Sequence, residues 1–523
     1  MIKYNMKMQY KMRKINTRFI LGLLILLAGE VIAKVEPASV FTNNMVLQAD
    51  KNIVVWGTAD VNEAITVSIN GVSAKTKGGT DGKWKVELPA MTYGGPYKLK
   101  FIGNNTLSMT NVMIGEVWIC AGQSNMRQPV RNSINAKEEI GNAKYKNIRF
   151  LTIPLDGSAE PKTKFNAKWV VCSKTTVANK TATGYFFGRK LHEDLDVAIG
   201  LIDVSYGGAT IFTFMDKETI ENTVDTASIY RLDRANRKKF QTAMTKWESN
   251  GRKGYKPTKV SKIYNANFKQ WKEEGRKGVK PFLASPNRYS SLCYNAMVHP
   301  LVPFSVKGAI WYQGEANTSS PESYVKWFGD YINMMRKHFN NTEMPYYFVQ
   351  LAGFENQPNT KVLPETWAKF RLGQEQCLKH PFTGMITAMD IGKKKNIHPK
   401  NKQEVGRRLA LSALHQTYGK TEVVYQGPTI KTIDQKGKKL LLTFEHCEGG
   451  LKNNKKRKLV SGFSAVLNNG KVVALEGEIK SSNTIEIKVS EVKRLRYAYA
   501  NYPDCPLYNG KGLPALSFDK EIK

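Results

Sequence analysis

Four residues that could carry out acyl transfer, three through side chains and one through its backbone N–H, follow apolar runs in the middle of the chain. They are Ser124, Gly208, Gln313 and His398. In open α/β sheets, ligands collect outside the carboxyl ends of the strands, where turns and helix N-termini present backbone donors. If the apolar runs are neighbouring strands, we expect the four residues to meet at one edge of a sheet.

The chemistry that these residue types support is attack on an ester carbonyl. Ser124 would be the nucleophile and His398 the base that takes its proton. The backbone N–H groups of Ser124 and of Gly207-Gly208, together with the side-chain amide of Gln313, would stabilise the oxyanion. His398 directly precedes a predicted helix, whose positive end disfavours imidazolium. His299 is the other histidine that we consider as a base.

A sheet with helices on its faces is needed to bring these residues together. Apolar runs typical of buried strands alternate with helical patterns through this part of the chain. We predict strands at residues 117–120, 198–204, 306–312, 346–351 and 385–390, and helices at 183–195, from 320 onward and at 399–418. The alternation predicts an α/β domain with a parallel sheet.

Both flanks of this region have a different pattern. Residues 35–113 and 423–523 alternate apolar and polar positions between Gly- and Asn-rich turns, which is typical of β structure. We therefore predict a β-sandwich-like domain at 34–112, a central domain at 113–421 and a second β-rich domain at 422–523.

A basic insertion interrupts the central domain at about residues 216–286. Within it, residues 247–257 are echoed by 271–281, and both copies contain Gly-Arg-Lys-Gly. Two copies are too few for a solenoid, so a duplicated hairpin or helix–turn element is predicted. It is either an arm that touches an acidic glycan or a partner, or a solvated insertion, and we favour the second interpretation.

The N-terminus is typical of a secretory signal. Six basic residues precede an apolar run at 19–28, and Val31-Ile32-Ala33 supplies a cleavage site. We predict that residues 1–33 are removed on export to the periplasm or the exterior, with an uncleaved anchor as the alternative. No later stretch reaches the roughly 18 apolar residues of a membrane span, so stable membrane insertion is not expected.

The charge and the cysteines narrow the possible partners. The chain has 79 Lys and Arg against 44 Asp and Glu, a formal charge of +35. Nucleic acid is nevertheless not expected, because the excess is spread out, the chain is predicted to be exported and no binding motif is present. The six cysteines show no metal-binding spacing, and we expect no metal or organic cofactor.

Three segments strongly resemble the sialate O-acetylesterases, within the SGNH hydrolase superfamily. They are residues 115–126, ending Ala-Gly-Gln-Ser-Asn-Met, residues 311–317, Trp-Tyr-Gln-Gly-Glu-Ala-Asn, and residues 397–403, beginning Ile-His-Pro. Shorter matches extend the resemblance over most of the mature chain, at 199–208, 292–304, 496–501 and 507–509. The resemblance implies a flavodoxin-like SGNH hydrolase core flanked by N- and C-terminal β-rich domains.

The same resemblance implies an activity and a set of roles. Carried over by position, it makes Ser124 the nucleophile, His398 the base, and Gly208 and Gln313 oxyanion donors. It implies a serine esterase that removes O-acetyl groups from sialic acids through an acetyl-enzyme. Action on another acetylated polysaccharide such as xylan, and a non-catalytic carbohydrate-binding protein, are the alternatives.

One departure concerns the residue that orients the imidazole. Many bacterial relatives have Asp two residues before the histidine, where this chain has Asn396. The orienting group could be Asp390, Asn396 or a backbone carbonyl, or the site could be a Ser–His dyad. Glu315 is expected to organise its own turn as a buried residue. Arg127 or Arg131 could bind a sialic acid carboxylate, although both could equally be ordinary surface residues.

Overall fold

The computed structural model describes residues 34–223, 238–239, 241–256, 261–275, 289–355 and 365–522. The predicted signal segment, residues 1–33, lies outside the described residues, as does much of the predicted basic insertion. Within the described part, no helix is both long enough and apolar enough to cross a membrane.

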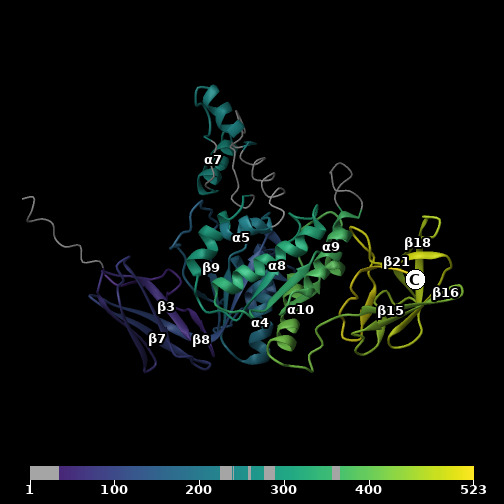
Figure 1. The fold of residues 1–523 in the computed structure, drawn as a ribbon, viewed down its shortest axis with the longest axis horizontal. Helices are drawn as coiled ribbons and strands as arrows, with labels where there is room; N and C mark the ends of the chain where they lie inside the picture. Colours follow the sequence, from purple (N-terminus) through teal and green to yellow (C-terminus); the bar gives the residue numbers. More distant parts are fainter. Residues whose placement is uncertain are drawn as a thin grey trace, which may run out of the picture. The chain divides into compact units, whose positions relative to one another are not determined.

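A parallel sheet forms the centre of the larger of two compact units (Figure 1). Its strands run in the order β9-β11-β8-β12-β13-β14, and the short β10 is antiparallel to β9. Their bounds are Thr106–Gly122 for β8, Ile148–Thr152 for β9, Val170–Val171 for β10, Ile199–Asp203 for β11, Gly308–Tyr312 for β12, Tyr346–Gln350 for β13 and Thr383–Thr387 for β14.

The register of the central strands aligns their carboxyl ends. Cys120 of β8 pairs with Asp203 of β11, and Gly122 of β8 pairs with Tyr312 of β12. The residues that follow these three strands therefore begin at the same edge of the sheet, as the spacing of the apolar runs predicts.

Helices cover both faces of this sheet, as side-chain alternation shows. Trp118 packs edge-on against Phe187 of α4, with ring centroids 5.0 Å apart, and lies 5.9 Å from Tyr347. The next residue, Phe348, points to the opposite face, where it packs 5.0 Å from Phe328 of α8. The α-helices of this unit, not all of which lie on the sheet, include α2 (Ser124–Arg127), α3 (Ala136–Asn142), α4 (Ala182–Leu195), α5 (Lys217–Asn222), α7 (Ser261–Glu273), α8 (Pro321–His338), α9 (Thr366–Gln376) and α10 (Lys402–Gln416).

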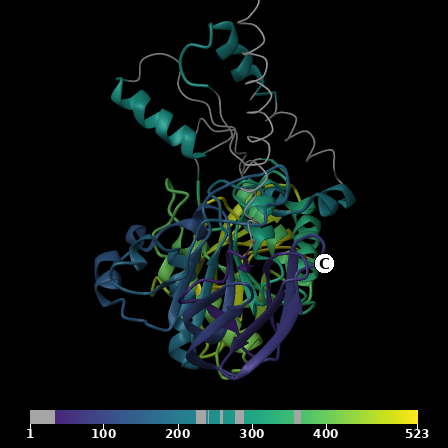
Figure 2. The ribbon, with the colours of Figure 1, turned by 90° about the vertical axis from the view of Figure 1, so that its left-hand side faces the viewer.

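The smaller unit consists of short antiparallel strands from described residues 34–37, 55–88 and 99–108, purple in Figures 1 and 2. The sheet order β1-β3-β6 joins Glu36–Pro37, Ile53–Thr58 and Lys83–Leu88, and β4 (Ala64–Ile69) pairs with β5 (Val72–Lys77) and β7 (Gly94–Ile102). Alternate residues of β4 and β6 are buried, as the period-two pattern predicts.

The predicted boundary at residues 112–113 lies inside a single continuous strand, β8. Residues 38–54 and 89–98 group with the larger unit, where β2 (Val46–Gln48) pairs parallel to β8.

A seven-stranded antiparallel sheet occupies the C-terminal region, in the order β15-β16-β20-β19-β18-β21-β23. Its strands are Thr429–Lys436, Lys439–Glu445, Thr484–Lys488, Val472–Ile479, Leu459–Leu467, Val492–Tyr497 and Phe518–Glu521 in that order, and β17 (Leu451–Asn453) pairs with β22 (Leu507–Asn509). Leu440, Phe463 and Leu495 belong to its buried core, which also includes Met389 from the segment after β14.

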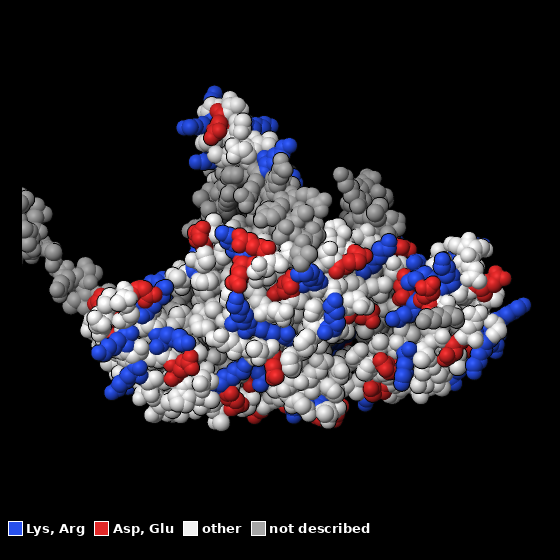
Figure 3. Space-filling model, viewed as in Figure 1, with Lys and Arg blue, Asp and Glu red and all other residues white. Residues whose placement is uncertain are grey.

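Charged residues lie on the surface, and most of the cysteines lie in the interior. Lys and Arg are interspersed with Asp and Glu over the face shown in Figure 3. All six cysteines are unpaired, and five of them are buried.

Candidate active site

Ser124 and His398 form a hydrogen-bonded pair, although they are far apart in the sequence. His398 Nε2 lies 2.7 Å from Ser124 Oγ. Ser124 is the first residue of α2, immediately beyond β8, and His398 lies in the loop before α10. This geometry suits proton transfer from a hydroxyl nucleophile to an imidazole base.

The turn that presents Ser124 is held by the neighbouring strand end. Gly122 has φ of +125°, and a Cβ there would lie 2.3 Å from the Tyr312 carbonyl oxygen, so only glycine fits. The backbone N–H of Gln123 donates to the same carbonyl at 2.8 Å. Gln123 Oε1 accepts the N–H of Ala316 at 3.3 Å, which joins the nucleophile turn to the turn after β12.

Asn125, the residue after the nucleophile, is buried and contacts both the Glu315 turn and the histidine loop. Its Nδ2 donates to Glu315 Oε1 at 2.5 Å and to the Ile397 carbonyl at 3.0 Å. Glu315 is half-buried rather than fully buried, and desolvation of its carboxyl group raises the pKa of that group. The nucleophile turn and the loop that carries the base are therefore tied together in the interior.

The surroundings of His398 favour its neutral form. Desolvation, and after it the positive charge of Lys402, lower the pKa of the imidazole from its ordinary value. A neutral ring is the form that can accept the Ser124 proton.

Of the two predicted oxyanion residues, Gly208 lies in a turn beside the nucleophile. Gly208 has φ of +67°, and a Cβ at Gly207 would lie 3.8 Å from the Ser124 Cβ. The side-chain amide of Gln313, the other predicted oxyanion residue, hydrogen-bonds to protein groups. Its Nε2 donates to the Ala209 carbonyl at 3.0 Å and to Asn317 Oδ1 at 2.7 Å, so both amide hydrogens are already used.

Asn317 contacts Gln313 and was not singled out as a site residue in the sequence analysis. Its Oδ1 accepts hydrogen bonds from Gln313 Nε2 and, at 3.2 Å, from the backbone N–H of Ile211, which fixes the amide orientation. Asn317 is 5% exposed, and its Nδ2 donates to no other described residue. In the sequence, this residue is the Asn that ends the Gln-Gly-Glu-Ala-Asn motif at residues 313–317.

Neither predicted orienting side chain contacts the imidazole. Asp390 Oδ1 and Oδ2 accept from Arg408 Nη1 and Nη2 at 2.8 and 2.7 Å, and Tyr508 donates to Oδ2 at 2.9 Å. Asn396 Oδ1 accepts the backbone N–H of His398 at 2.9 Å, so it organises the loop rather than the ring. Among the described residues, none accepts a hydrogen bond from the ring Nδ1 of His398.

Two further candidates serve other contacts. His299 Nδ1 lies 2.8 Å from the Lys162 carbonyl, and the histidine that contacts Ser124 Oγ is His398. Arg127 Nη1 donates to the Ser205 carbonyl at 3.1 Å and lies 3.5 Å from Asp203 Oδ2, while Arg131 is exposed.

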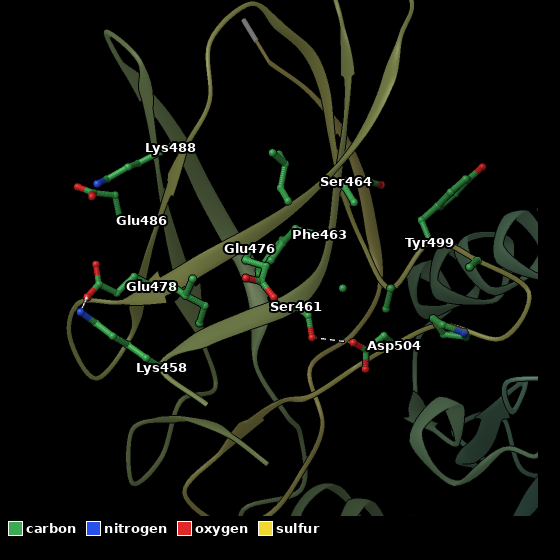
Figure 4. A pocket seen from close by; sticks show the side chains of 17 residues that line it. Lys458, Ser461, Phe463, Ser464, Glu476, Glu478, Glu486, Lys488, Tyr499 and Asp504 are labelled. Carbon is green, nitrogen blue, oxygen red and sulfur yellow. Dashed lines mark hydrogen bonds and ion pairs between the residues drawn. The ribbon is translucent and has the colours of Figure 1, made fainter. Parts of the chain in front are cut away.

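A cleft of about 1030 Å³ lies on the C-terminal sheet and does not include the Ser124 pair (Figure 4). Residues of β18, β19 and β20 and of the 498–504 segment line it, among them Glu476 and Tyr499. In the described part of the chain, no cluster of three or more His, Cys, Asp or Glu is arranged to hold a metal ion.

Known proteins are similar to this chain in sequence and in fold. A family model described as carbohydrate esterase, sialic acid-specific acetylesterase matches residues 266–415. The sialate O-acetylesterase of Mus musculus is 30% identical over 436 residues, which cover 76% of each chain. That of Homo sapiens is 28% identical over 531 residues, covering 92% of this chain and 91% of the human protein. The crystal structure of a carbohydrate acetylesterase from Xanthomonas citri is 28% identical, covers 94% of this chain and all of that one, and has a TM-score of 0.77.

Proposed function

Because the chain belongs to the sialate O-acetylesterase family and is a carbohydrate O-acetylesterase, we propose that it removes O-acetyl groups from sialic acids after export. The observation that carries this proposal is the 2.7 Å contact between Ser124 Oγ and His398 Nε2. The names of the mammalian relatives support sialic acid as the sugar. The predicted signal segment supports export, which would leave a mature protein that begins at Lys34.

The proposed mechanism is a two-step acyl transfer. Ser124 Oγ attacks the acetyl carbonyl while His398 Nε2 takes the hydroxyl proton. The tetrahedral intermediate collapses as His398 returns that proton to the departing sugar oxygen, which leaves an acetyl-enzyme. Water then gives a proton to His398 and attacks the acetyl group, and collapse releases acetate and regenerates Ser124.

The oxyanion donors that we propose are the backbone N–H groups of Ser124 and Gly208 and the Nδ2 of Asn317. Ser124 stands at the start of α2, where backbone N–H groups have no partner within the helix. Gln313 then acts indirectly, because its amide holds Asn317 Oδ1 and turns Asn317 Nδ2 away from itself. This replaces the direct role that the sequence suggested for Gln313.

The orienting contacts support a Ser–His dyad. Asp390 is paired with Arg408, and Asn396 contacts backbone rather than the ring. In this proposal the imidazole is positioned by the loop that carries it.

The order of the central strands supports an SGNH hydrolase core at residues 113–421. Leaving aside β9 and the short edge strand β10, the sheet order β11-β8-β12-β13-β14 corresponds to 2-1-3-4-5 in chain order, which is the flavodoxin-like arrangement.

The test compares acetate release from acetylated sialic acid with that from acetylated xylan, using wild type, Ser124→Ala and the exposed control Ser249→Ala. We expect faster release from sialic acid, loss of at least about 10³-fold in kcat for Ser124→Ala, and no change for the control. Preference for xylan would redirect the substrate while keeping the chemistry. Failure of wild type to hydrolyse either substrate or p-nitrophenyl acetate would favour a binding protein without catalysis.

A further inference from the structure

Lys402 is a charged side chain that the acyl-transfer mechanism does not use. It is 0% exposed, although it is the first residue of α10. Its Nζ donates to Asn125 Oδ1 at 2.6 Å and to the Pro399 carbonyl at 2.9 Å, and it lies 5.3 Å from the centre of the Tyr312 ring. A side chain so enclosed cannot reach substrate, so any effect on the reaction must act through its neighbours.

Those neighbours lie on both sides of the proposed base. The carbonyl before His398, that of Ile397, accepts from Asn125 Nδ2 at 3.0 Å, and the carbonyl after it, that of Pro399, accepts from Lys402 Nζ. Asn125 itself is held by Lys402 through its Oδ1 and directly follows Ser124 in the chain. One ammonium group therefore contacts a side chain of the nucleophile turn and the backbone of the histidine loop.

We propose that Lys402 is the positioning residue that holds His398 in register with Ser124. The inference rests on the proposed esterase function. Lys402 would supply the orientation that a carboxylate beside the ring otherwise provides, but its charge acts on imidazolium in the opposite direction. Orientation comes from the two backbone carbonyls that flank His398, and the positive charge disfavours a second positive charge on the ring.

The electrostatic surroundings agree with this role. Burial lowers the pKa of Lys402 to about 7, and the nearby Glu315 carboxylate acts in the opposite direction. Burial raises the pKa of Glu315, and Lys402 acts to lower it. His398 and Tyr312 complete the titratable groups around the ammonium, and Lys402 contributes to the lowered pKa of His398. Loss of the ammonium charge should therefore raise the pKa of His398.

The main experiment uses Lys402→Met, with Lys400→Met as the matched control. Lys400 is exposed and lies nearer to His398 in sequence, so its variant makes the same change of charge without touching the buried contacts. With p-nitrophenyl acetate, Lys402→Met should lower kcat by about 10²-fold with little change in KM, because small misplacements of reacting groups cost about this much. It should also move the acid limb of the kcat/KM profile to higher pH, whereas Lys400→Met should change neither quantity.

A second variant covers the case in which Lys402→Met fails to fold. Glu315→Gln keeps an acceptor for Asn125 and removes the carboxylate charge that favours Lys402 protonation. Lys402 would then be neutral over more of the pH range, and the acid limb should again move upward. A wild-type profile in Glu315→Gln or in folded Lys402→Met overturns the positioning role. An inactive wild-type enzyme, in contrast, overturns the proposed esterase function itself.

Discussion

The protonation of His398 determines the pH dependence expected of the site. The free enzyme is active when the ring is neutral, and desolvation together with Lys402 lowers the pKa of the ring from 6.5. Because a lowered pKa keeps the base neutral in more acidic solution, kcat/KM should rise with pH around a midpoint below 6.5. A kcat/KM profile between pH 4 and 8 checks this, and a flat profile or a midpoint above 6.5 would contradict it.

The oxyanion role of Asn317 predicts a selective loss of turnover. Asn317→Ala removes the one proposed side-chain donor, and loss of such a donor typically lowers kcat by about 10²- to 10³-fold. Asn333→Ala, on the exposed side of α8, is the control and should behave as wild type. Steady-state kinetics with p-nitrophenyl acetate distinguish the two, and unchanged kcat in Asn317→Ala would remove it from the site.

For single residues, the sequence predicted which residues lie near the site better than it predicted which hydrogen bonds their atoms make. Ser124 and His398 could be paired in advance because each follows a strand in the same sheet. The direct role of Gln313 could not be judged, since Ala209 and Asn317 consume its amide hydrogens only in the folded chain. The role of Asp390 could not be judged either, because Arg408, which binds its carboxylate in the folded chain, lies on the next helix.

At the scale of elements, apolar runs located the buried strands but missed β9. Arg149 interrupts the apolar pattern of that strand. The structure accommodates it because its guanidinium donates to the carbonyls of Asn44 at 3.2 Å, Asn111 at 3.1 Å and Lys146 at 2.8 Å. Such compensation by distant carbonyls cannot be seen in a sequence window, so the sixth parallel strand was not predicted.

Thr181 links α4 to α2, and its substitution tests how much this link contributes to stability. Its Oγ1 accepts the N–H of Gly184 at 3.1 Å as the N-cap of α4 and donates to the Met126 carbonyl of α2 at 2.6 Å. Thr181→Ala should lower the free energy of unfolding by about 1–2 kcal/mol, as loss of a helix cap does. Urea denaturation checks this against the exposed control Thr175→Ala, for which a change within about 0.5 kcal/mol is expected. Equal stability of the two variants would contradict the capping role.

At the scale of the whole chain, Asp390 connects the central domain to the C-terminal β region. Burial acts to lower the pKa of Arg408, but Asp390 and Glu404 overcome it, and the net shift is upward. Tyr508, in β22, donates to the same Asp390 carboxylate. The carboxylate is therefore assigned to stability rather than to the orientation of His398.

Asp390→Asn separates these two roles. Removing one partner of a buried ion pair typically costs about 3–5 kcal/mol, and Glu404, which remains bound to Arg408 at 2.7 Å, should place the loss at the lower end. Thermal or urea unfolding should show the destabilisation, while the acid limb of kcat/KM for the folded variant stays at the wild-type pH. A shifted limb would restore Asp390 as the third member of a triad.

The unpaired cysteines have a practical consequence for a chain predicted to work outside the cytoplasm. No disulfide joins the six cysteines in the fold. Burial also raises the pKa of the Cys120 thiol well above its ordinary value, which keeps the reactive thiolate scarce. We therefore expect a reducing agent to leave the activity unchanged.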